Sequence, residues 1–332
     1  MKLERVQILR FVAAGAVVAF HSYGKVASEL PAPNWLWPLR FGGYGVDLFF
    51  VISGFIIHLT VRSRKRDWKL FLQRRALRII PLYWVCTLTV FLLLLVFARG
   101  SVPSYGLLIR SLFFLSWTQG PGVMPVVYLG WTLEYEILFY SLIGIAMAIF
   151  TGPLRVGCVL LALLAFIGAV MELNGPTRTI HFIFNPILLE FAFGLLIGEG
   201  LFRGRIPWLE LAPVAVATVM ILPLAWGHRV WFAGLPAAAL VLSAAFLDAR
   251  KPLRNVVGKV LAWLGDASYS IYLSQVITIS VLGRMDMIGA RYAAFEVIVA
   301  SIFIGGLIGG ILLYLLVEAP LRRLVRRRSV RP

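Results

Sequence analysis

The sequence predicts an all-α protein, a polytopic membrane bundle of about ten transmembrane helices. Two observations predict it. Of the 332 residues, 60% are apolar and only 14% are charged, whereas about 25% are charged in soluble proteins. The roughly 200 apolar residues supply about ten spans of about 20 residues and little else. A soluble enzyme is therefore excluded, and we expect one integral-membrane domain over residues 1–332.

The expected helices follow from apolar stretches separated by charged, proline-rich or glycine-rich segments. Between the third and fourth stretches, prolines and glycines surround a shorter apolar piece, 107–117, which is too short to span and is expected to lie at the interface or to re-enter the membrane. The ten expected spans cover 8–23, 44–61, 79–98, 129–150, 155–172, 185–201, 210–226, 231–247, 261–282 and 294–317.

The basic residues set the expected orientation, because cytoplasmic loops of membrane proteins are enriched in Lys and Arg. With ten spans, 24 of the 32 Lys and Arg residues fall on the side of both termini and 8 on the other side. Both termini are therefore expected in the cytoplasm. An eleventh span at 107–117 would place the arginine-rich tail outside. The net charge of +17 then reflects topology and contact with membrane lipids, and no nucleic-acid partner is expected.

Several other site classes are not expected. Cys86 and Cys158 both lie within apolar runs, which indicates core residues and not a disulfide or a CxxC metal site. No two of the four histidines share metal-ligand spacing, so we expect no metal. The chain also lacks GxSxG and Walker A motifs.

The first expected helix carries Arg10 and His21. Eleven residues at 100° each place both side chains on one helix face, about 16 Å apart along the axis. A structural interpretation has Arg10 reaching to the cytoplasmic surface and His21 making an interhelical hydrogen bond. The functional interpretation is a cation near the cytoplasmic face and, deeper in the membrane, a group that exchanges protons near neutral pH.

Two further segments carry polar groups on the second and third expected helices. The second helix begins GVDLFFVISGF, where Ser53 and Gly54 would let another helix or a thin ligand approach closely. In the basic segment at 62–80, Arg74, Arg75 and Arg78 are helical neighbours that could form one cationic face. That face could contact anionic lipid headgroups, or it could bind a ligand with phosphate groups at a cytoplasmic mouth.

The fourth expected helix begins GWTLEYEILFY and contains two carboxylates. Glu134 and Glu136 are about 200° apart around the axis, so they cannot face the same neighbour. Thr132, Glu136 and Tyr140 share one stripe, which favours Glu136 as the inward-facing acid. An ion pair with an arginine elsewhere in the bundle is the structural alternative for either residue. Polar candidates farther along the chain are Asn185, Glu190, Asp266, Ser268, Tyr269, Tyr272 and Gln275.

Taken together, these segments resemble the integral-membrane acyltransferase family 3, and most closely its exopolysaccharide O-acetyltransferase branch. The resemblance runs in order from residue 5 to about 323. The first four matching pieces are specific in combination, although each alone is weak. The pieces are VQILRFVAAGAVVAFHSYG, GVDLFFVISGF, FLQRRALRIIPLYW, GWTLEYEILFY, NPILLEFAFGLLIG, LGDASYSIYLSQ and VEAPLRR.

The resemblance implies a multi-pass enzyme of the bacterial inner membrane that moves an acyl group, usually acetyl, from cytoplasmic acyl-CoA to a sugar hydroxyl. The acceptor would be an exported or lipid-linked glycan such as exopolysaccharide. Site roles carried over by motif make His21 the catalytic base with Arg10 as its partner and Glu136 as the acid of the fourth-helix motif. The basic motif with Arg75 and Arg78, beside Arg74, would bind the CoA phosphates, and Ser53 lies in the second motif.

Two positions depart from the family pattern. Many members have Asp where this chain has Gln7, a departure that fits the exopolysaccharide branch, and many have His where this chain has Gln275. The chemistry needs a held thioester, removal of one proton and stabilisation of an oxyanion. His21 could serve as the base, or it could itself be acylated and relay the group.

Other functions are compatible with intramembrane charges. A glycan transporter or flippase would line its path with them, although no inverted repeat is apparent. A non-catalytic component of a polysaccharide synthesis complex is a further alternative. The sequence leaves the acyl group, the acceptor sugar and the oligomeric state open.

Overall fold

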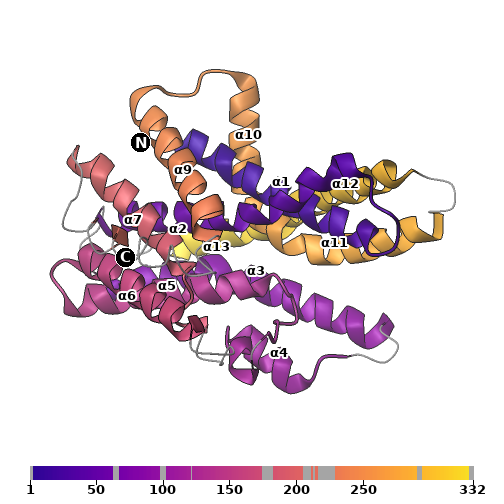
Figure 1. Cartoon of the computed structure of the whole chain (residues 1–332), viewed down its shortest axis with the longest axis horizontal. Helices are drawn as coiled ribbons and strands as arrows, with labels where there is room; N and C mark the ends of the chain where they lie inside the picture. The colour runs from indigo at the N-terminus through magenta and orange to yellow at the C-terminus, as the bar shows by residue number, and fades with distance from the viewer. Residues whose placement is uncertain are drawn as a thin grey trace.

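We analysed a computed structural model of the chain, which describes residues 3–62, 67–97, 102–120, 122–173, 182–204, 211, 214–215, 229–289 and 294–328. Each regular element named in these ranges is helical (Figure 1). The α-helices are α1 (Glu4–Ala27), α2 (Gly45–Arg62), α3 (Trp68–Phe97), α4 (Tyr105–Leu112), α5 (Gly130–Ile149), α6 (Pro153–Leu173), α7 (Leu188–Arg203), α9 (Leu235–Arg250), α10 (Val256–Asp266), α11 (Ser268–Gly289), α12 (Phe295–Leu313) and α13 (Ala319–Arg328). Short 3-10 and π segments are η1 (Asn34–Tyr44), η2 (Ser116–Gln119), η5 (Val230–Gly234) and η6 (Tyr314–Glu318).

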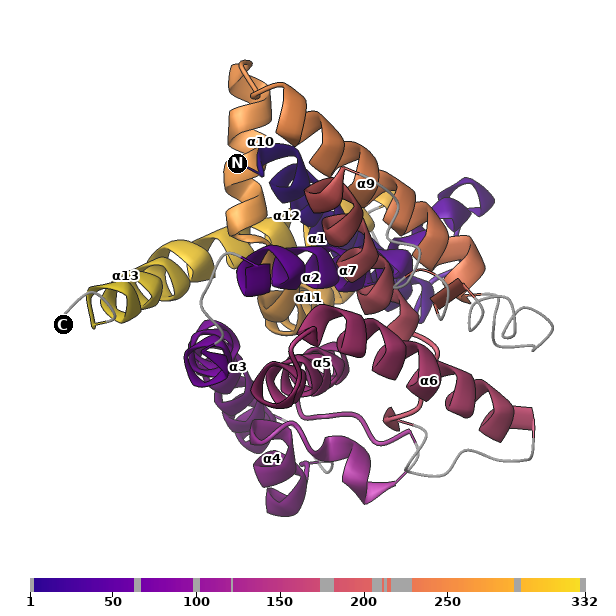
Figure 2. The ribbon, with the colours of Figure 1, turned by 90° about the vertical axis from the view of Figure 1, so that its left-hand side faces the viewer.

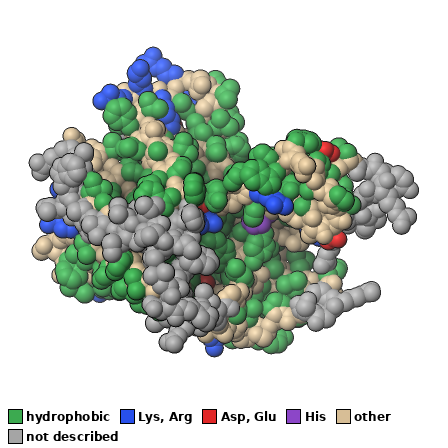
Figure 3. Space-filling model, in the orientation of Figure 1, with side chains coloured by type: hydrophobic (Ala, Val, Ile, Leu, Met, Phe, Trp, Pro, Cys, Tyr) green, Lys and Arg blue, Asp and Glu red, His purple; other side chains and the backbone are tan. Residues whose placement is uncertain are grey.

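Six helical stretches in the described part of the chain are long and apolar enough to cross a bilayer. They are built on α1, on η1 with α2, on α3, on α5, on η5 with α9, and on α12 with its C-terminal continuation. Hydrophobic side chains cover most of the face drawn in Figure 3. The described part of the chain is thus an all-helical bundle with six candidate membrane spans.

Most of the expected helices coincide with observed ones, and the differences have physical causes. The expected helix over 261–282 is wrong as one span: α10 ends at Asp266, α11 begins at Ser268, and α10 runs across the direction of α11 in Figure 1. Both pieces are apolar, so hydropathy does not register the change of direction. The third helix begins at Trp68, earlier than expected, and 107–117 forms the short α4 and the start of η2. The expected helix over 210–226 lies largely outside the described residues.

The most extensive contact between two helices joins α2 to α7. A Cβ atom on Gly54 would lie 2.1 Å from the carbonyl oxygen of Phe191, and one on Gly194 would lie 2.1 Å from that of Val51. The glycines therefore let the two backbones touch, as small residues do at membrane helix interfaces. This contact fixes the position of Ser53, which precedes Gly54 on α2.

Side-chain contacts tie the start of α1 to the end of α9. The Arg5 guanidinium donates to Asp248 Oδ1 at 3.0 Å, and Glu4 accepts a hydrogen bond from the Leu253 backbone N–H at 3.2 Å.

The basic helix α13 projects sideways from the same region (Figure 2). Arg10, on α1, has Arg78 and Arg322 as charged neighbours, so the starts of α1 and α3 and the beginning of α13 lie at one end of the bundle. His21 and Lys25 lie farther along α1, toward the opposite end.

Candidate active site

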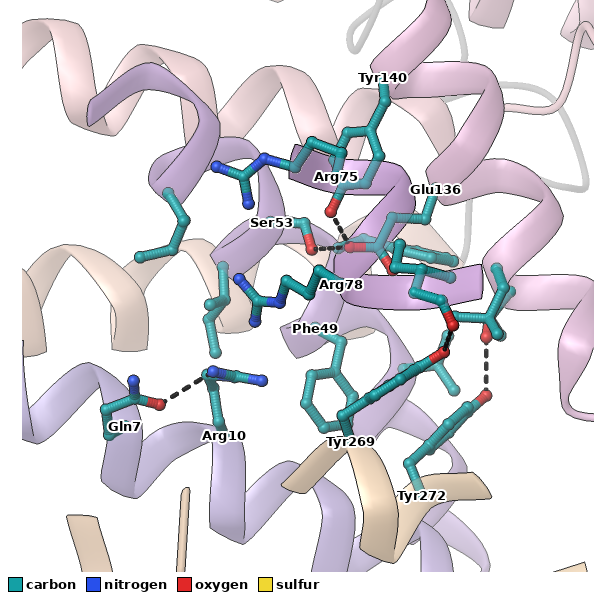
Figure 4. Close-up of a pocket in the computed structure, with 17 residues that line it drawn as sticks. Gln7, Arg10, Phe49, Ser53, Arg75, Arg78, Glu136, Tyr140, Tyr269 and Tyr272 are labelled. Atoms are coloured by element: carbon teal, nitrogen blue, oxygen red, sulfur yellow. Dashed lines mark hydrogen bonds between the residues drawn. The ribbon is translucent and has the colours of Figure 1, made fainter. Parts of the chain in front are cut away.

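A cavity of about 190 Å³ lies where α1, α2, α3, α5 and α11 meet (Figure 4). We call it the arginine cavity, because Arg10, Arg75 and Arg78 line it together with Glu136. Three guanidinium groups face one carboxyl group, so the cavity carries an excess of positive charge. Its other lining residues are Gln7, Val46, Phe49, Phe50, Ile52, Ser53, Ile56, Ile79, Thr132, Leu133, Tyr140, Tyr269 and Tyr272.

Arg75 is held firmly in the wall of the arginine cavity. Only 8% of it is exposed, and its Nη2 donates to Thr60 Oγ1 at 2.6 Å. Its guanidinium also lies 5.8 Å from the ring centroid of Phe71 and 5.6 Å from that of Tyr140. A planar, pre-positioned guanidinium suits a ligand with several anionic oxygens.

Two of the three arginines predicted to form one cationic face on α3 line the arginine cavity. Arg75 and Arg78 line the cavity, whereas Arg74 is absent from its lining. Residues 75 and 78 are one helical turn apart, so they project in similar directions. The cavity lining thus includes two of the three α3 arginines, joined by Arg10 from α1.

Arg10 completes the positive side from a different helix. Its Nη1 donates to Gln7 Oε1 at 3.0 Å, a bond within one turn of α1. Figure 4 shows the Arg10 and Arg78 side chains extending into the same space. The uncharged side chain of Gln7 therefore positions Arg10 through a hydrogen bond.

Glu136 is the acid that faces the arginine cavity. It accepts hydrogen bonds from Ser53 Oγ at 3.0 Å and from the Tyr140 hydroxyl. Glu134 is turned away and accepts from the backbone N–H and hydroxyl of Ser116 at 2.8 and 2.7 Å. Thr132, Glu136 and Tyr140, the stripe that predicted an inward-facing Glu136, all line the cavity.

His21 does not line the arginine cavity. It borders a second space of about 450 Å³, which we call the histidine recess. Lys25 from α1 and Tyr128 from the loop before α5 also line this recess, along with Phe20, Gly24, Ile279 and Ser280. Arg10 and His21, predicted on one face of one helix, therefore serve two separate spaces.

The hydrogen bonds of His21 fix its tautomer. Nδ1 lies 3.0 Å from the Val17 carbonyl oxygen and 3.1 Å from Gln275 Oε1, and both of these atoms are acceptors. The Gln275 orientation is set by its Nε2, which donates to the Tyr272 carbonyl oxygen at 3.0 Å. Nδ1 therefore carries the proton, and Nε2 keeps the lone pair that a general base needs.

Gln275 is a site residue with only an indirect signal in the sequence. It appeared there as a departure from a family pattern, without a partner. It is fully buried on α11, one turn after Tyr272, which lines the arginine cavity. Helix α11 thus contributes Tyr269 and Tyr272 to the arginine cavity and Ile279 and Ser280 to the histidine recess, and its Gln275 contacts His21.

Aromatic side chains line both spaces. Phe49 meets Tyr272 edge to face with ring centroids 5.7 Å apart, and the Tyr272 hydroxyl lies 2.9 Å from Thr132 Oγ1. Tyr128 packs against the His21 ring at 5.3 Å.

A profile of the acyltransferase domain matches residues 3–317, nearly the whole chain. The chain belongs to the acyltransferase 3 family. It is 33% identical to the exopolysaccharide production protein ExoZ of Rhizobium meliloti, over 87% of this chain and 92% of that protein. It is 25% identical to the acyltransferase MdmB of Streptomyces mycarofaciens, over 99% and 94%.

A third relative in this family is the O-acetyl transferase of Shigella phage Sf6, which is 29% identical over 56% of this chain and 59% of that protein. No solved structure matches the chain. Family membership makes the protein a membrane acyltransferase that uses an acyl donor. Among the described residues, no group of three or more His, Cys, Asp or Glu side chains could hold a metal ion.

Proposed function

We propose that the protein transfers an acetyl group from cytoplasmic acetyl-CoA to a sugar hydroxyl of an exported or lipid-linked glycan, in the bacterial inner membrane. The observation that carries this proposal is the pairing of a cationic cavity with a histidine whose Nε2 is free to act as a base. The two sites lie at different depths along α1. The name of the exopolysaccharide production protein supports a polysaccharide acceptor.

The arginine cavity is proposed to bind the CoA part of the donor. Arg10, Arg75 and Arg78 match the phosphate oxygens in charge and geometry, and the tyrosines offer hydrogen-bonding walls to the pantetheine arm. Glu136 offsets part of the positive charge and positions Tyr140 and Ser53 through its hydrogen bonds. The thioester would then extend along α1 toward His21.

The proposed chemistry needs one base and no redox partner. His21 Nε2 takes the proton of the sugar hydroxyl while its oxygen attacks the thioester carbonyl carbon. The tetrahedral oxyanion collapses, the carbon–sulfur bond breaks, and the CoA thiolate takes the proton back from Nε2. The products are an O-acetyl sugar and CoA. Gln275 and Val17 keep Nδ1 protonated throughout and stabilise the imidazolium that forms transiently.

Purified protein in nanodiscs tests the donor assignment. Wild type should release CoA from acetyl-CoA faster than from succinyl-CoA, and slow release should persist without a glycan. S-acetyl-pantetheine, which lacks the phosphates of the nucleotide, should need a much higher concentration than acetyl-CoA. A protein that neither binds nor consumes any acyl-CoA would contradict the proposal and would favour glycan transport.

The proposed orientation has ten spans with both termini in the cytoplasm. Because Cys86 and Cys158 are buried, single surface cysteines can report on sidedness with little background. Arg323→Cys on α13 should react with a membrane-impermeant maleimide only after spheroplasts are lysed. Ser104→Cys at the start of α4 should react in intact spheroplasts. The reverse pattern would overturn the orientation.

A further inference from the structure

A third space of about 190 Å³ lies beside α7 and the start of η5, and the activity described above does not use it. We call it the glutamate recess. Its polar lining residues are Trp131, Asn185, Glu190 and Arg229. Asn185 and Glu190 were already notable in the sequence as polar residues inside an expected span.

Glu190 is the feature that points to a ligand. The residue is 0% exposed, yet neither of its carboxyl oxygens accepts a hydrogen bond from an N–H or hydroxyl group of the described residues, and the side chain that it meets is the carboxyl group of Asp47. Burying a polar group without a partner is costly, so such groups in native structures call for an explanation. Gly234 on η5 leaves room for this side chain, since a Cβ there would lie 3.2 Å from Glu190 Oε1.

The charge of the glutamate recess differs from that of the arginine cavity. Arg229 donates to both oxygens of the fully buried Asp47, at 2.9 and 2.8 Å, so its charge is already matched. Glu190 has this pair as its charged neighbours. Two carboxyl groups against one guanidinium disfavour a phosphate, and the carboxyl oxygens of Glu190 can accept hydrogen bonds from the hydroxyls of an uncharged ligand.

The remaining polar groups suit a sugar ring. Asn185 Oδ1 accepts from the Ile187 backbone N–H at 2.9 Å, which holds the side chain and leaves its amide as a donor. Trp131 is braced edge to face by Phe50 and Tyr135, at 6.4 and 5.9 Å. A sugar needs both donors and acceptors for its hydroxyls and a flat apolar wall for its C–H face, and this recess has all three.

One stretch of the chain contributes to the lining of both the glutamate recess and the histidine recess. Tyr128 borders His21 and Trp131, three residues later, borders Glu190. The Asp47–Arg229 pair joins the start of α2 to the start of η5, and the Arg229 guanidinium lies 5.7 Å from the Tyr44 ring centroid. Helix α9 begins here and ends near Arg5, so the recess lies toward the end of the bundle opposite to Arg5.

We propose that the glutamate recess binds a neutral sugar of the acceptor glycan, next to the sugar whose hydroxyl reacts at His21. The proposal rests on the acyltransferase function proposed above. Glu190 and Asn185 would hydrogen-bond the hydroxyls of this sugar, and Trp131 would stack on its ring. The recess thus selects the acceptor and takes no part in donor binding.

The test compares two measurements on Glu190→Gln, Asn185→Ala and Trp131→Ala. The first is acceptor-independent CoA release from acetyl-CoA by the purified proteins in nanodiscs, which should stay within twofold of wild type. The second is base-labile acetate on glycan isolated from producing cells that carry each chromosomal variant. It should fall at least tenfold. Glu296→Gln on α12 and Trp35→Ala on η1 are matched controls, and both should leave the two values unchanged.

Each result separates the recess from the rest of the enzyme. Normal glycan acetylation in the variants would overturn the proposal, and so would parallel loss of CoA release from well-folded protein. Absence of CoA release and of glycan acetate in wild type would instead refute the proposed function, and the acceptor site with it. If Glu190→Gln does not fold, Trp131→Ala and Asn185→Ala carry the test, because their side chains make no ion pair.

Discussion

The arginine cavity and the histidine recess lie along the same helix, yet the charged and polar groups that line them differ. The first gathers three guanidinium groups around one carboxyl group. The second contains a single imidazole held by two neutral acceptors, a backbone carbonyl and an amide. The arginine cavity is thus organised to hold charge and the histidine recess to move a proton, and α1 and α11 connect them.

The separation also explains why both regions can be specialised. A cluster of cations beside the imidazole would disfavour its protonated form and weaken it as a base. With Arg10 about 16 Å away along α1, that repulsion is reduced. Phosphate binding and proton transfer can therefore be optimised independently.

Removal of the imidazole should have the largest effect. His21→Ala should lower the rate of acetyl transfer by about 10²- to 10⁴-fold, the range that general-base catalysis contributes. Acetyl-CoA should still bind, because the arginine cavity is intact. Transfer is measured in membranes of producing cells with radiolabelled acetyl-CoA, and binding is measured by calorimetry on purified protein.

Ser280→Ala is the control for the histidine recess. Its hydroxyl lines the same space but donates to the Val276 carbonyl oxygen at 2.6 Å, so its loss should leave the rate nearly unchanged. A His21→Ala protein that transfers acetyl within tenfold of the wild-type rate would remove the imidazole from the mechanism. The histidine recess would then have no catalytic role.

Replacement of one cavity arginine should have the next largest effect. Arg78→Ala should raise the KM for acetyl-CoA about 10- to 100-fold, because a charge-assisted hydrogen bond contributes about 1.5–3 kcal/mol. Arg74→Ala, four residues away and outside the cavity, should change the KM less than twofold. Steady-state CoA release at varied acetyl-CoA measures both. Equal effects of the two substitutions would mean that general surface charge attracts the donor.

Replacement of the His21 partner should have a smaller effect. Gln275→Leu should lower kcat about 3- to 10-fold with little change in KM for acetyl-CoA, since one neutral hydrogen bond contributes about 1 kcal/mol. Gln275→His, the residue common in the family, should retain most of the activity. Nitrogen NMR of the labelled imidazole should give Nδ1–H as the main tautomer in wild type and a mixture in Gln275→Leu. An unchanged tautomer together with reduced kcat would leave Gln275 with a purely structural role.

Much of the fold could be predicted because a bilayer imposes strong constraints on composition and length. The α5 stripe of Thr132, Glu136 and Tyr140 was predictable for the same reason, since helical periodicity alone decides which of two glutamates shares a face with its neighbours. The bend between α10 and α11 was not predictable from hydropathy. Apolar residues lie on both sides of it.

The site was harder to predict where it depends on contacts between helices. Periodicity could not distinguish Arg74 from Arg75, because the direction of a helix face relative to its neighbours is set by tertiary packing. Nor could it pair His21 with Gln275, which lies 254 residues away in sequence. Aromatic side chains from α2, α11 and the loop before α5 line the two spaces. No local pattern encodes that arrangement.

Ionic strength should have the smallest effect, and it contrasts the two regions directly. Salt screens charges that solvent can reach, so the KM for acetyl-CoA should rise roughly two- to fivefold when sodium chloride is raised from about 50 to 500 mM. The same titration with S-acetyl-pantetheine, which has no phosphate to meet the arginines, should leave its KM flat. Arg78→Ala should reduce the salt dependence for acetyl-CoA toward that of the pantetheine substrate. If both donors respond equally in wild type, the salt acts on the protein as a whole, and the arginine cavity is not the place where the donor charge is bound.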